Sequence, residues 1–116
     1  MSAPACISPF DVAEAQLEAY NAQDLEAFLS FYDDDVVVAD FNGAVTGQGI
    51  AALRDRYAAL FAQYPENHAE LMNRIVIGPT VIDHERVRRT PGGDSFDVAA
   101  IYTIADAKIV RVDFVK

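Results

Sequence analysis

Residues 20–41 read YNAQDLEAFLSFYDDDVVVADF, and along this stretch the chain changes from a helical pattern to a strand pattern. Asp24 is expected to cap a short helix, because an aspartate at that position accepts a hydrogen bond from the first backbone amides of a helix. The acids at 33–35 are expected to end this helix, whose apolar stripe consists of Leu25, Phe28, Leu29 and Tyr32. Residues 36–41 are mostly β-branched and predict a strand, and the Asn42-Gly43 pair after them is typical of a hairpin turn.

Two further helices are predicted, one on each side of this stretch. Ser8, Pro9 and Asp11 form a helix-start signature, because serine caps a helix, proline fits its first turn, and an acid three residues after the cap completes a capping box. The apolar positions of this first helix are Phe10, Ala13, Leu17 and Tyr20. After Gly47-Gln48-Gly49 another helix is predicted to run to Pro65, with an apolar face of Ile50, Leu53, Tyr57, Leu60, Phe61 and Tyr64.

The rest of the chain predicts four longer strands, at residues 69–77, 80–89, 96–105 and 108–115. Turn residues separate them, so three consecutive hairpins are expected to form a mostly antiparallel sheet. Helices followed by strands predict an α+β fold, with residues 1–7 as an N-terminal tail and residues 8–116 as a single domain. Because some strands are apolar on both faces, one face of the sheet is expected to cover the helices, and the other to meet a second copy in a homodimer.

Length and composition narrow the class of protein. The chain has 116 residues, of which 52% are hydrophobic and 23% charged, so an ordinary soluble domain with one core is expected. The sequence has no run of about 20 apolar residues, so no membrane span is predicted. The first ten residues lack the features of a signal peptide. The single cysteine, Cys6, excludes an internal disulfide and a cysteine-cluster metal site. A cytoplasmic location is therefore expected.

The charge pattern argues against nucleic acid and anionic membranes as partners. The chain has 18 acidic and 9 basic residues, a formal net charge of −9, and nine of the acids precede the first basic residue, Arg54. A phosphate-binding surface needs a basic patch, and the first half of the chain has none. Arg86, Arg88 and Arg89 cluster near Pro91-Gly92-Gly93 and are expected to form a solvated hairpin end.

Neither a metal nor another cofactor is expected. His68 and His84 lie sixteen positions apart and lack the spacing of a metal site. The acids at 33–35 lack the glycine and the twelfth-position glutamate of a calcium-binding loop, so they predict a solvated helix end.

Asp40 is the first candidate for a catalytic role. The alternation of a strand places Val36, Val38 and Asp40 on one face, so a carboxylate ends an otherwise apolar row. If that row faces inward, Asp40 lies at the mouth of an apolar cavity, where desolvation raises the pKa of a carboxyl group and suits it to proton transfer. The alternative is an aspartate at a strand end that hydrogen-bonds into the following turn.

His84 is the second candidate. Alternation along its strand places it with Ile82 and on the opposite side from Asp83 and Glu85. An imidazole among apolar neighbours can move protons near pH 7. The alternative is a partly buried histidine that is bonded to a neighbouring side chain.

Five segments of the chain resemble the nuclear-transport-factor-2-like superfamily, and within it most closely the ketosteroid isomerase and SnoaL-like (polyketide cyclase-like) branch. These segments are residues 20–28, 32–41, 47–54, 81–87 and 108–112. The resemblance covers nearly the whole chain from about residue 8 onward. It implies a cone in which three N-terminal helices pack on a curved, mostly antiparallel sheet. Isomerases, dehydratases, cyclases, hydrolases and non-catalytic binding proteins all share this fold, so the fold alone does not decide the reaction.

The resemblance also implies roles for individual residues. Asp40 falls where ketosteroid isomerases hold their general base, and the position of His84 faces their cavity. Gln16 stands in place of their helix tyrosine and Tyr102 in place of their second carboxylic acid, so both are candidate hydrogen-bond donors to a developing oxyanion. From the strand pattern alone, Tyr102 is equally an aromatic side chain that packs on the helices.

These features together lead to two hypotheses for function. The first is a cofactor-independent isomerase, cyclase or dehydratase that moves a proton next to a carbonyl of a small apolar molecule, with His84 as a second acid–base or orienting group. The second is a non-catalytic module that binds an apolar ligand or forms a dimer. In both, the side chains expected to line the cavity are Tyr20, Phe41, Tyr57 and Phe114.

Overall fold

Three helices and one six-stranded sheet make up the fold in a computed structural model, which describes residues 7–116. The elements are α1 (Pro9–Ala22), α2 (Leu25–Leu29), β1 (Tyr32–Asp40), β2 (Val45–Gln48), α3 (Ile50–Gln63), β3 (His68–Ile77), β4 (Thr80–Arg88), β5 (Ser95–Ala105) and β6 (Lys108–Val115). The strand order is β2-β1-β6-β5-β4-β3. The predicted α+β fold is confirmed, and residues 1–6 of the predicted tail lie outside the described residues.

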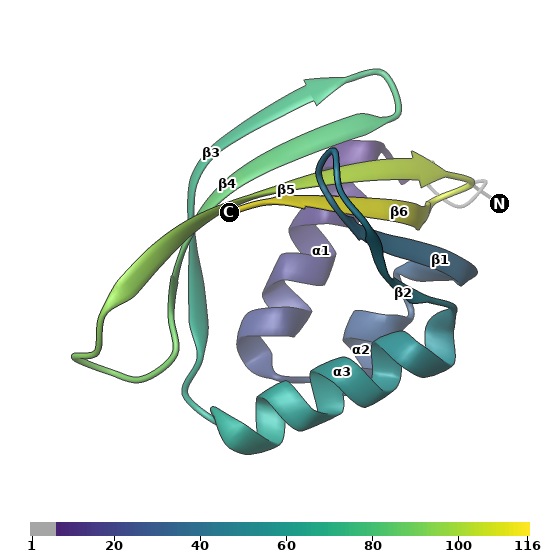
Figure 1. The fold of residues 1–116 in the computed structure, drawn as a ribbon. Helices are drawn as coiled ribbons and strands as arrows, with labels where there is room; N and C mark the ends of the chain where they lie inside the picture. Colours follow the sequence, from purple (N-terminus) through teal and green to yellow (C-terminus); the bar gives the residue numbers. More distant parts are fainter. Residues whose placement is uncertain (1–6) are drawn as a thin grey trace, which may run out of the picture.

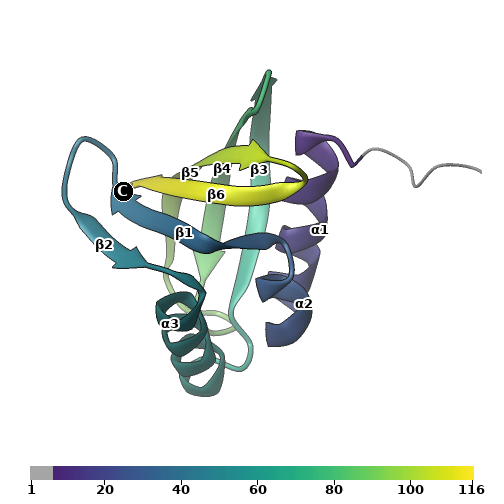
Figure 2. The ribbon, with the colours of Figure 1, turned by 90° about the vertical axis from the view of Figure 1, so that its right-hand side faces the viewer.

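The sheet is curved, and all three helices lie on its concave side. Figure 1 shows the long strands β3, β4 and β5 bending over α1. In Figure 2, α1 and α2 stand together on one side, while α3 lies beneath the β1–β2 hairpin. None of the helices in residues 7–116 has the length and apolar composition needed to cross a membrane.

The helix signals of the sequence are confirmed at their starts. Ser8 caps α1, and Asp11 completes the capping box, with reciprocal hydrogen bonds of 3.1 and 3.2 Å. The Asp24 side chain accepts from the backbone amide of Ala27 at 3.2 Å, which caps α2. α3 follows Gly49, whose φ of 88° is a conformation that glycine adopts without strain.

One helix boundary was predicted wrongly. The acids at 33–35 do not end α2: that helix ends at Leu29, and the acids already belong to β1. The reason is tertiary, because the start of β1 is fixed by its parallel pairing with β6, where Tyr32 lies opposite Ile109. The strand therefore begins four residues before the β-branched segment that predicted it.

The sheet pairing follows the predicted hairpins and adds one long-range contact. β3 to β6 form three successive antiparallel hairpins, and their ends lie within one residue of the predicted strands. β1, in contrast, pairs in parallel with β6, so the first half of the chain is joined to its last strand.

Aromatic rings from four elements form the centre of the core. Phe28 of α2 is 1% exposed, and its ring centroid lies 4.6 Å from that of Tyr57, 4.9 Å from that of Tyr32, and 6.0 and 6.2 Å from those of Tyr20 and Phe61. Contacts of this kind add to the stabilisation that burial of the rings supplies. They hold α1, α2, α3 and β1 in fixed positions around the space beneath the sheet.

A buried ion pair joins the sheet to α1. Asp83 of β4 is fully buried, and its carboxylate accepts two hydrogen bonds from Arg74 of β3, at 2.7 and 3.0 Å. The same guanidinium donates to Glu14 of α1 at 2.8 Å. The ring of Phe10, predicted as part of the apolar helix face, is 48% exposed and covers this guanidinium at 4.9 Å.

The convex face of the sheet carries exposed apolar side chains. Ile75 and Ile77 of β3 are 46% and 68% exposed. Apolar residues at these positions agree with the sequence pattern of strands that are apolar on both faces. The homodimer inferred from that pattern stays a prediction.

The buried ion pair makes a testable prediction about stability. Arg74→Met is expected to lower the free energy of unfolding by about 3–5 kcal/mol, because it leaves the buried Asp83 charge without a partner. Denaturation in urea measures this change. Arg86→Met is the matched control, because its partner Asp97 and the arginine side chain are both 44% exposed, and solvent screens an exposed ion pair so that it contributes little to stability. Equal losses in the two variants would contradict the role given to Arg74.

Candidate active site

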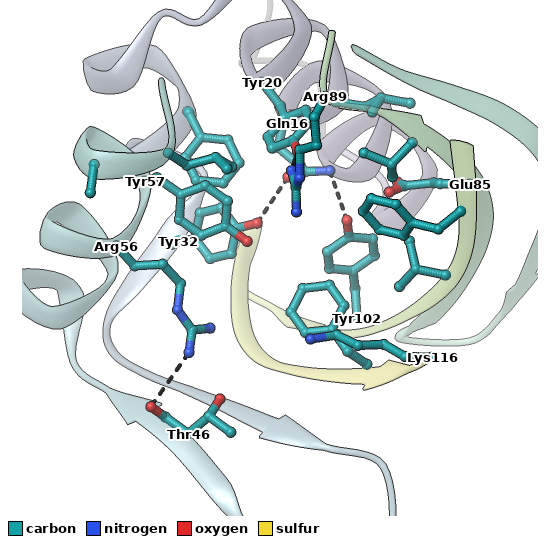
Figure 3. Close-up of a pocket in the computed structure, with 18 of the residues that line it drawn as sticks. Gln16, Tyr20, Tyr32, Thr46, Arg56, Tyr57, Glu85, Arg89, Tyr102 and Lys116 are labelled. Atoms are coloured by element: carbon teal, nitrogen blue, oxygen red, sulfur yellow. Dashed lines mark hydrogen bonds between the residues drawn. The ribbon is translucent and has the colours of Figure 1, made fainter. Parts of the chain in front are cut away.

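A cavity of about 510 Å³ opens between the helices and the concave face of the sheet. Apolar side chains such as Leu17, Phe28, Val87, Val98 and Phe114 form part of its wall, and polar and charged side chains form the rest. Figure 3 looks into this cavity and shows polar side chains that enter it from α1, α3, β1, β4 and β5. A cavity of this size and character is typical of a small-molecule site.

The deepest polar group is a chain of three hydrogen-bonded side chains. The Tyr32 hydroxyl donates to Oε1 of Gln16 at 2.9 Å, and Nε2 of Gln16 donates to the Tyr102 hydroxyl at 3.0 Å, as the dashed lines in Figure 3 mark. Nε2 also donates to the backbone carbonyl of Ala13 at 3.3 Å. Because that carbonyl can only accept, it sets the orientation of the Gln16 amide.

These three hydrogen-bonded side chains leave the hydroxyl proton of Tyr102 available to a ligand. The Tyr102 oxygen accepts from Gln16, and among residues 7–116 no side chain or backbone group accepts the Tyr102 proton. Burial raises the pKa values of Tyr32 and Tyr102 well above 10, so both phenols are neutral donors. The prediction that Gln16 and Tyr102 lie together in the cavity is confirmed, and their roles stay predictions.

A carboxyl group that the sequence analysis did not select lies in the same cavity. Glu85 of β4 is only 7% exposed, and its Oε2 atom is buried with no hydrogen-bond partner. Burial, followed by the nearby Asp83 charge, raises the pKa of Glu85 to about 7, and Arg74 partly offsets this increase. The group therefore exchanges a proton near neutral pH.

His84 lies on the other side of the sheet, and its predicted orientation toward the cavity is wrong. The Val81, Asp83, Glu85 and Val87 side chains of β4 are buried, so His84 between them points outward. Its Nε2 atom lies 2.8 Å from a carboxylate oxygen of Asp97, and its side chain is 45% exposed. The alternative of a histidine bonded to a neighbouring side chain is the arrangement present.

Asp97 holds a small charged cluster on this outer face. Its carboxylate accepts from Arg86 at 2.9 Å as well as contacting His84. The Arg86 hydrogen bond, followed by the His84 contact, lowers the pKa of Asp97 to about 2. The histidine therefore belongs to an exposed ion cluster rather than to the cavity.

Asp40 reaches the cavity only at its rim. It lines the opening as predicted, but the residue is exposed, whereas Val36 and Val38 of the same row are buried. The shielding from water that was expected around Asp40 is therefore absent, because β1 ends at the mouth of the cone. Its role as a general base stays a prediction.

Three of the four aromatic residues predicted to line the cavity do so. Tyr20, Tyr57 and Phe114 are part of its wall. Phe41 is not: it follows the end of β1 and is 51% exposed. The difference arises because β1 ends one residue before Phe41, so the chain turns away before this ring reaches the cavity.

Arg89, predicted at a solvated hairpin end, is instead held at the cavity wall. Its guanidinium donates to Oδ1 of the buried Asn67 at 2.8 Å and to the Tyr20 hydroxyl at 3.5 Å. It also lies over two aromatic rings, 5.0 Å from the centroid of Phe96 and 5.7 Å from that of Tyr64. These contacts fix a positive charge beside the opening.

Comparison with known proteins relates this fold and cavity to a described family. A family model of a SnoaL-like domain matches residues 13–112. The structure of an uncharacterized cystatin-fold protein from Novosphingobium aromaticivorans is 36% identical, with a TM-score of 0.86 over 94% of this chain and 98% of that one. No protein of curated function matches the chain at a significant level.

Two further structures carry functional names. A proposed polyketide cyclase from Sinorhizobium meliloti is 25% identical, with a TM-score of 0.77 over 90% of this chain and 94% of that one. A proposed ketosteroid isomerase from Kribbella flavida is 15% identical, with a TM-score of 0.77 over 91% of this chain and 75% of that one. The second likeness is one of fold, and the expected cone of helices on a curved sheet is confirmed.

The raised pKa of Glu85 predicts how stability depends on pH. Between the ordinary glutamate pKa of 4.5 and about 7, the folded chain binds more protons at this site than the unfolded chain, so the free energy of unfolding falls as the pH rises. Glu85→Gln removes this effect. The stability gained from the substitution is therefore expected to be about 3 kcal/mol larger at pH 8 than at pH 4.

Urea denaturation of the parent and variant at the two pH values measures this difference. Glu70→Gln, at an exposed position of β3, is the matched control because it makes the same chemical change outside the cavity. The same pH dependence in both substitutions would contradict the burial effect assigned to Glu85.

Proposed function

The chain belongs to the SnoaL-like domain family, and on that premise we propose that it is an enzyme that moves a proton at a carbon next to a carbonyl group. The substrate has a flat, largely apolar body that fits the cavity. One observation supports the proposal above all: the buried, unpartnered carboxyl group of Glu85 shares the cavity with the available proton of Tyr102.

The proposed reaction assigns one task to each group. The Glu85 carboxylate removes a proton from the carbon, and the electron pair of the broken C–H bond moves toward the carbonyl oxygen to form an enolate. Tyr102 donates its hydrogen bond to that oxygen, and the Gln16 amide polarises the phenol by donating to it. Glu85 then returns its proton to carbon, at the same atom or at another atom of the enolate.

Burial is the reason for choosing Glu85 over Asp40 as the base. A general base is most effective when its pKa lies near the working pH, and burial raises the pKa of Glu85 to about 7. Asp40 is exposed at the rim, where water solvates its charge.

The test is an exchange reaction that needs nothing except proton transfer. The flat bicyclic ketone 2-tetralone is dissolved in D₂O, and NMR follows the replacement of the hydrogens next to its carbonyl by deuterium. The protein is expected to accelerate this exchange. Glu85→Gln is expected to slow the catalysed rate by about 10²–10⁴-fold, and Tyr102→Phe by about 10²–10³-fold.

Two control variants make the result specific. Glu70→Gln is expected to leave the rate unchanged, because this exposed position lies outside the cavity. Asp40→Asn is expected to change it by less than about threefold, and loss of exchange in Asp40→Asn with full activity in Glu85→Gln would contradict the assignment of the base. Binding of 2-tetralone without any protein-dependent exchange would favour the non-catalytic binding module instead.

A further inference from the structure

The basic residues that line the cavity form no ion pairs with carboxylates in the described part of the chain. Within residues 7–116, four of the chain's nine basic residues form ion pairs with carboxylates: Arg54, Arg74, Arg86 and Arg111. In the same part of the structure Arg88 and Lys108 donate to backbone carbonyl groups. The three that line the cavity, Arg56, Arg89 and Lys116, also have no ion-pair partner among residues 7–116, although Arg56 donates to the backbone carbonyl of Thr46 at 3.5 Å.

These three charges surround the opening. Figure 3 shows Arg56, Arg89 and Lys116 on different sides of the cavity. They come from α3, from the segment after β4, and from the chain end after β6. One acid, Asp40, lines the same rim, so the mouth of the cavity is net positive in a chain whose formal net charge is −9.

Arg89 is the best-defined of the three charges. Asn67 is 2% exposed, and its amide donates to the Tyr20 hydroxyl at 2.7 Å while its oxygen accepts from Arg89. The guanidinium is thus oriented by neutral groups that do not cancel its charge. A ligand that binds there loses little free energy in ordering the side chain.

A buried polar atom inside the cavity also lacks a partner. Oε2 of Glu85 has no hydrogen bond, so the site is incomplete without a ligand or water. The cavity therefore combines apolar walls, neutral donors at depth and an unneutralised cation at the entrance.

We infer that the substrate is an amphipathic carboxylate: a flat apolar ring system whose carbonyl group enters toward Tyr102 and whose carboxylate pairs with Arg89 at the mouth. This inference rests on the proposed function for the carbonyl end of the molecule. The planar guanidinium offers parallel N–H groups that match a carboxylate, which is why we choose this anion. The cavity volume of about 510 Å³ limits the ring system to a few fused or linked rings.

The test compares two probes of the same shape that differ in charge. Isothermal titration calorimetry measures the binding of 2-naphthoate and of neutral 2-naphthamide at pH 6. The carboxylate is expected to bind at least tenfold more tightly than the amide. Arg89→Met is expected to remove this preference, whereas Arg88→Met is expected to keep it, because Arg88 is exposed and does not line the cavity.

A second pair of variants keeps the test valid if Arg89→Met does not fold. Arg56 and Lys116 are exposed, and each replacement by methionine is expected to lower the preference for 2-naphthoate by about two- to fivefold. Equal affinities of the parent protein for the two probes would overturn the inference, even with 2-tetralone exchange intact. A clear preference for 2-naphthoate without any exchange would support the anion site and contradict the proposed reaction.

Discussion

The burial of Glu85 without a counter-ion is the constraint on which the candidate site depends. Alternation along β4 turns Asp83 and Glu85 to the same interior face. Arg74 neutralises Asp83 with a bidentate hydrogen bond, but no side chain in residues 7–116 does the same for Glu85. A carboxyl group in that position costs stability when it is charged, and uncompensated costs of this kind are concentrated at functional sites.

The surrounding fold explains how such a group is kept accessible to a ligand. The aromatic contacts of Phe28 fix α2 against α3 and β1, and the parallel pairing of β1 with β6 joins the first half of the chain to the last strand of the sheet. The Gln16 amide then links phenols from two different strands. The cavity is therefore polar at its deep end, apolar along its walls and cationic at its mouth, and a molecule with the matching order of groups has one favourable orientation.

Much of the local structure and part of the site were predictable from the sequence. Capping residues predicted the helix starts, and turn residues predicted the four long strands to within one residue, because both depend on neighbours in the chain. The meeting of Gln16 and Tyr102 followed from the family resemblance. Glu85 was missed because His84 was assigned to the cavity, and alternation along the strand then placed Glu85 on the opposite face. Val81 and Val87, which share its alternation, were the available signal for the inward face.

The sequence by itself determined which segments are helices and strands, and which residues share a face of each strand, because backbone propensity and side-chain alternation act over a few residues. The tertiary structure alone decided which face is inside. That choice depends on contacts between elements: Arg74 of the neighbouring strand makes the burial of Asp83 tolerable, and alternation along β4 then places Glu85 inward and His84 outward. Similarly, Arg89 lies at the cavity wall and not at the predicted solvated hairpin end, because Asn67 and two aromatic rings hold its guanidinium there.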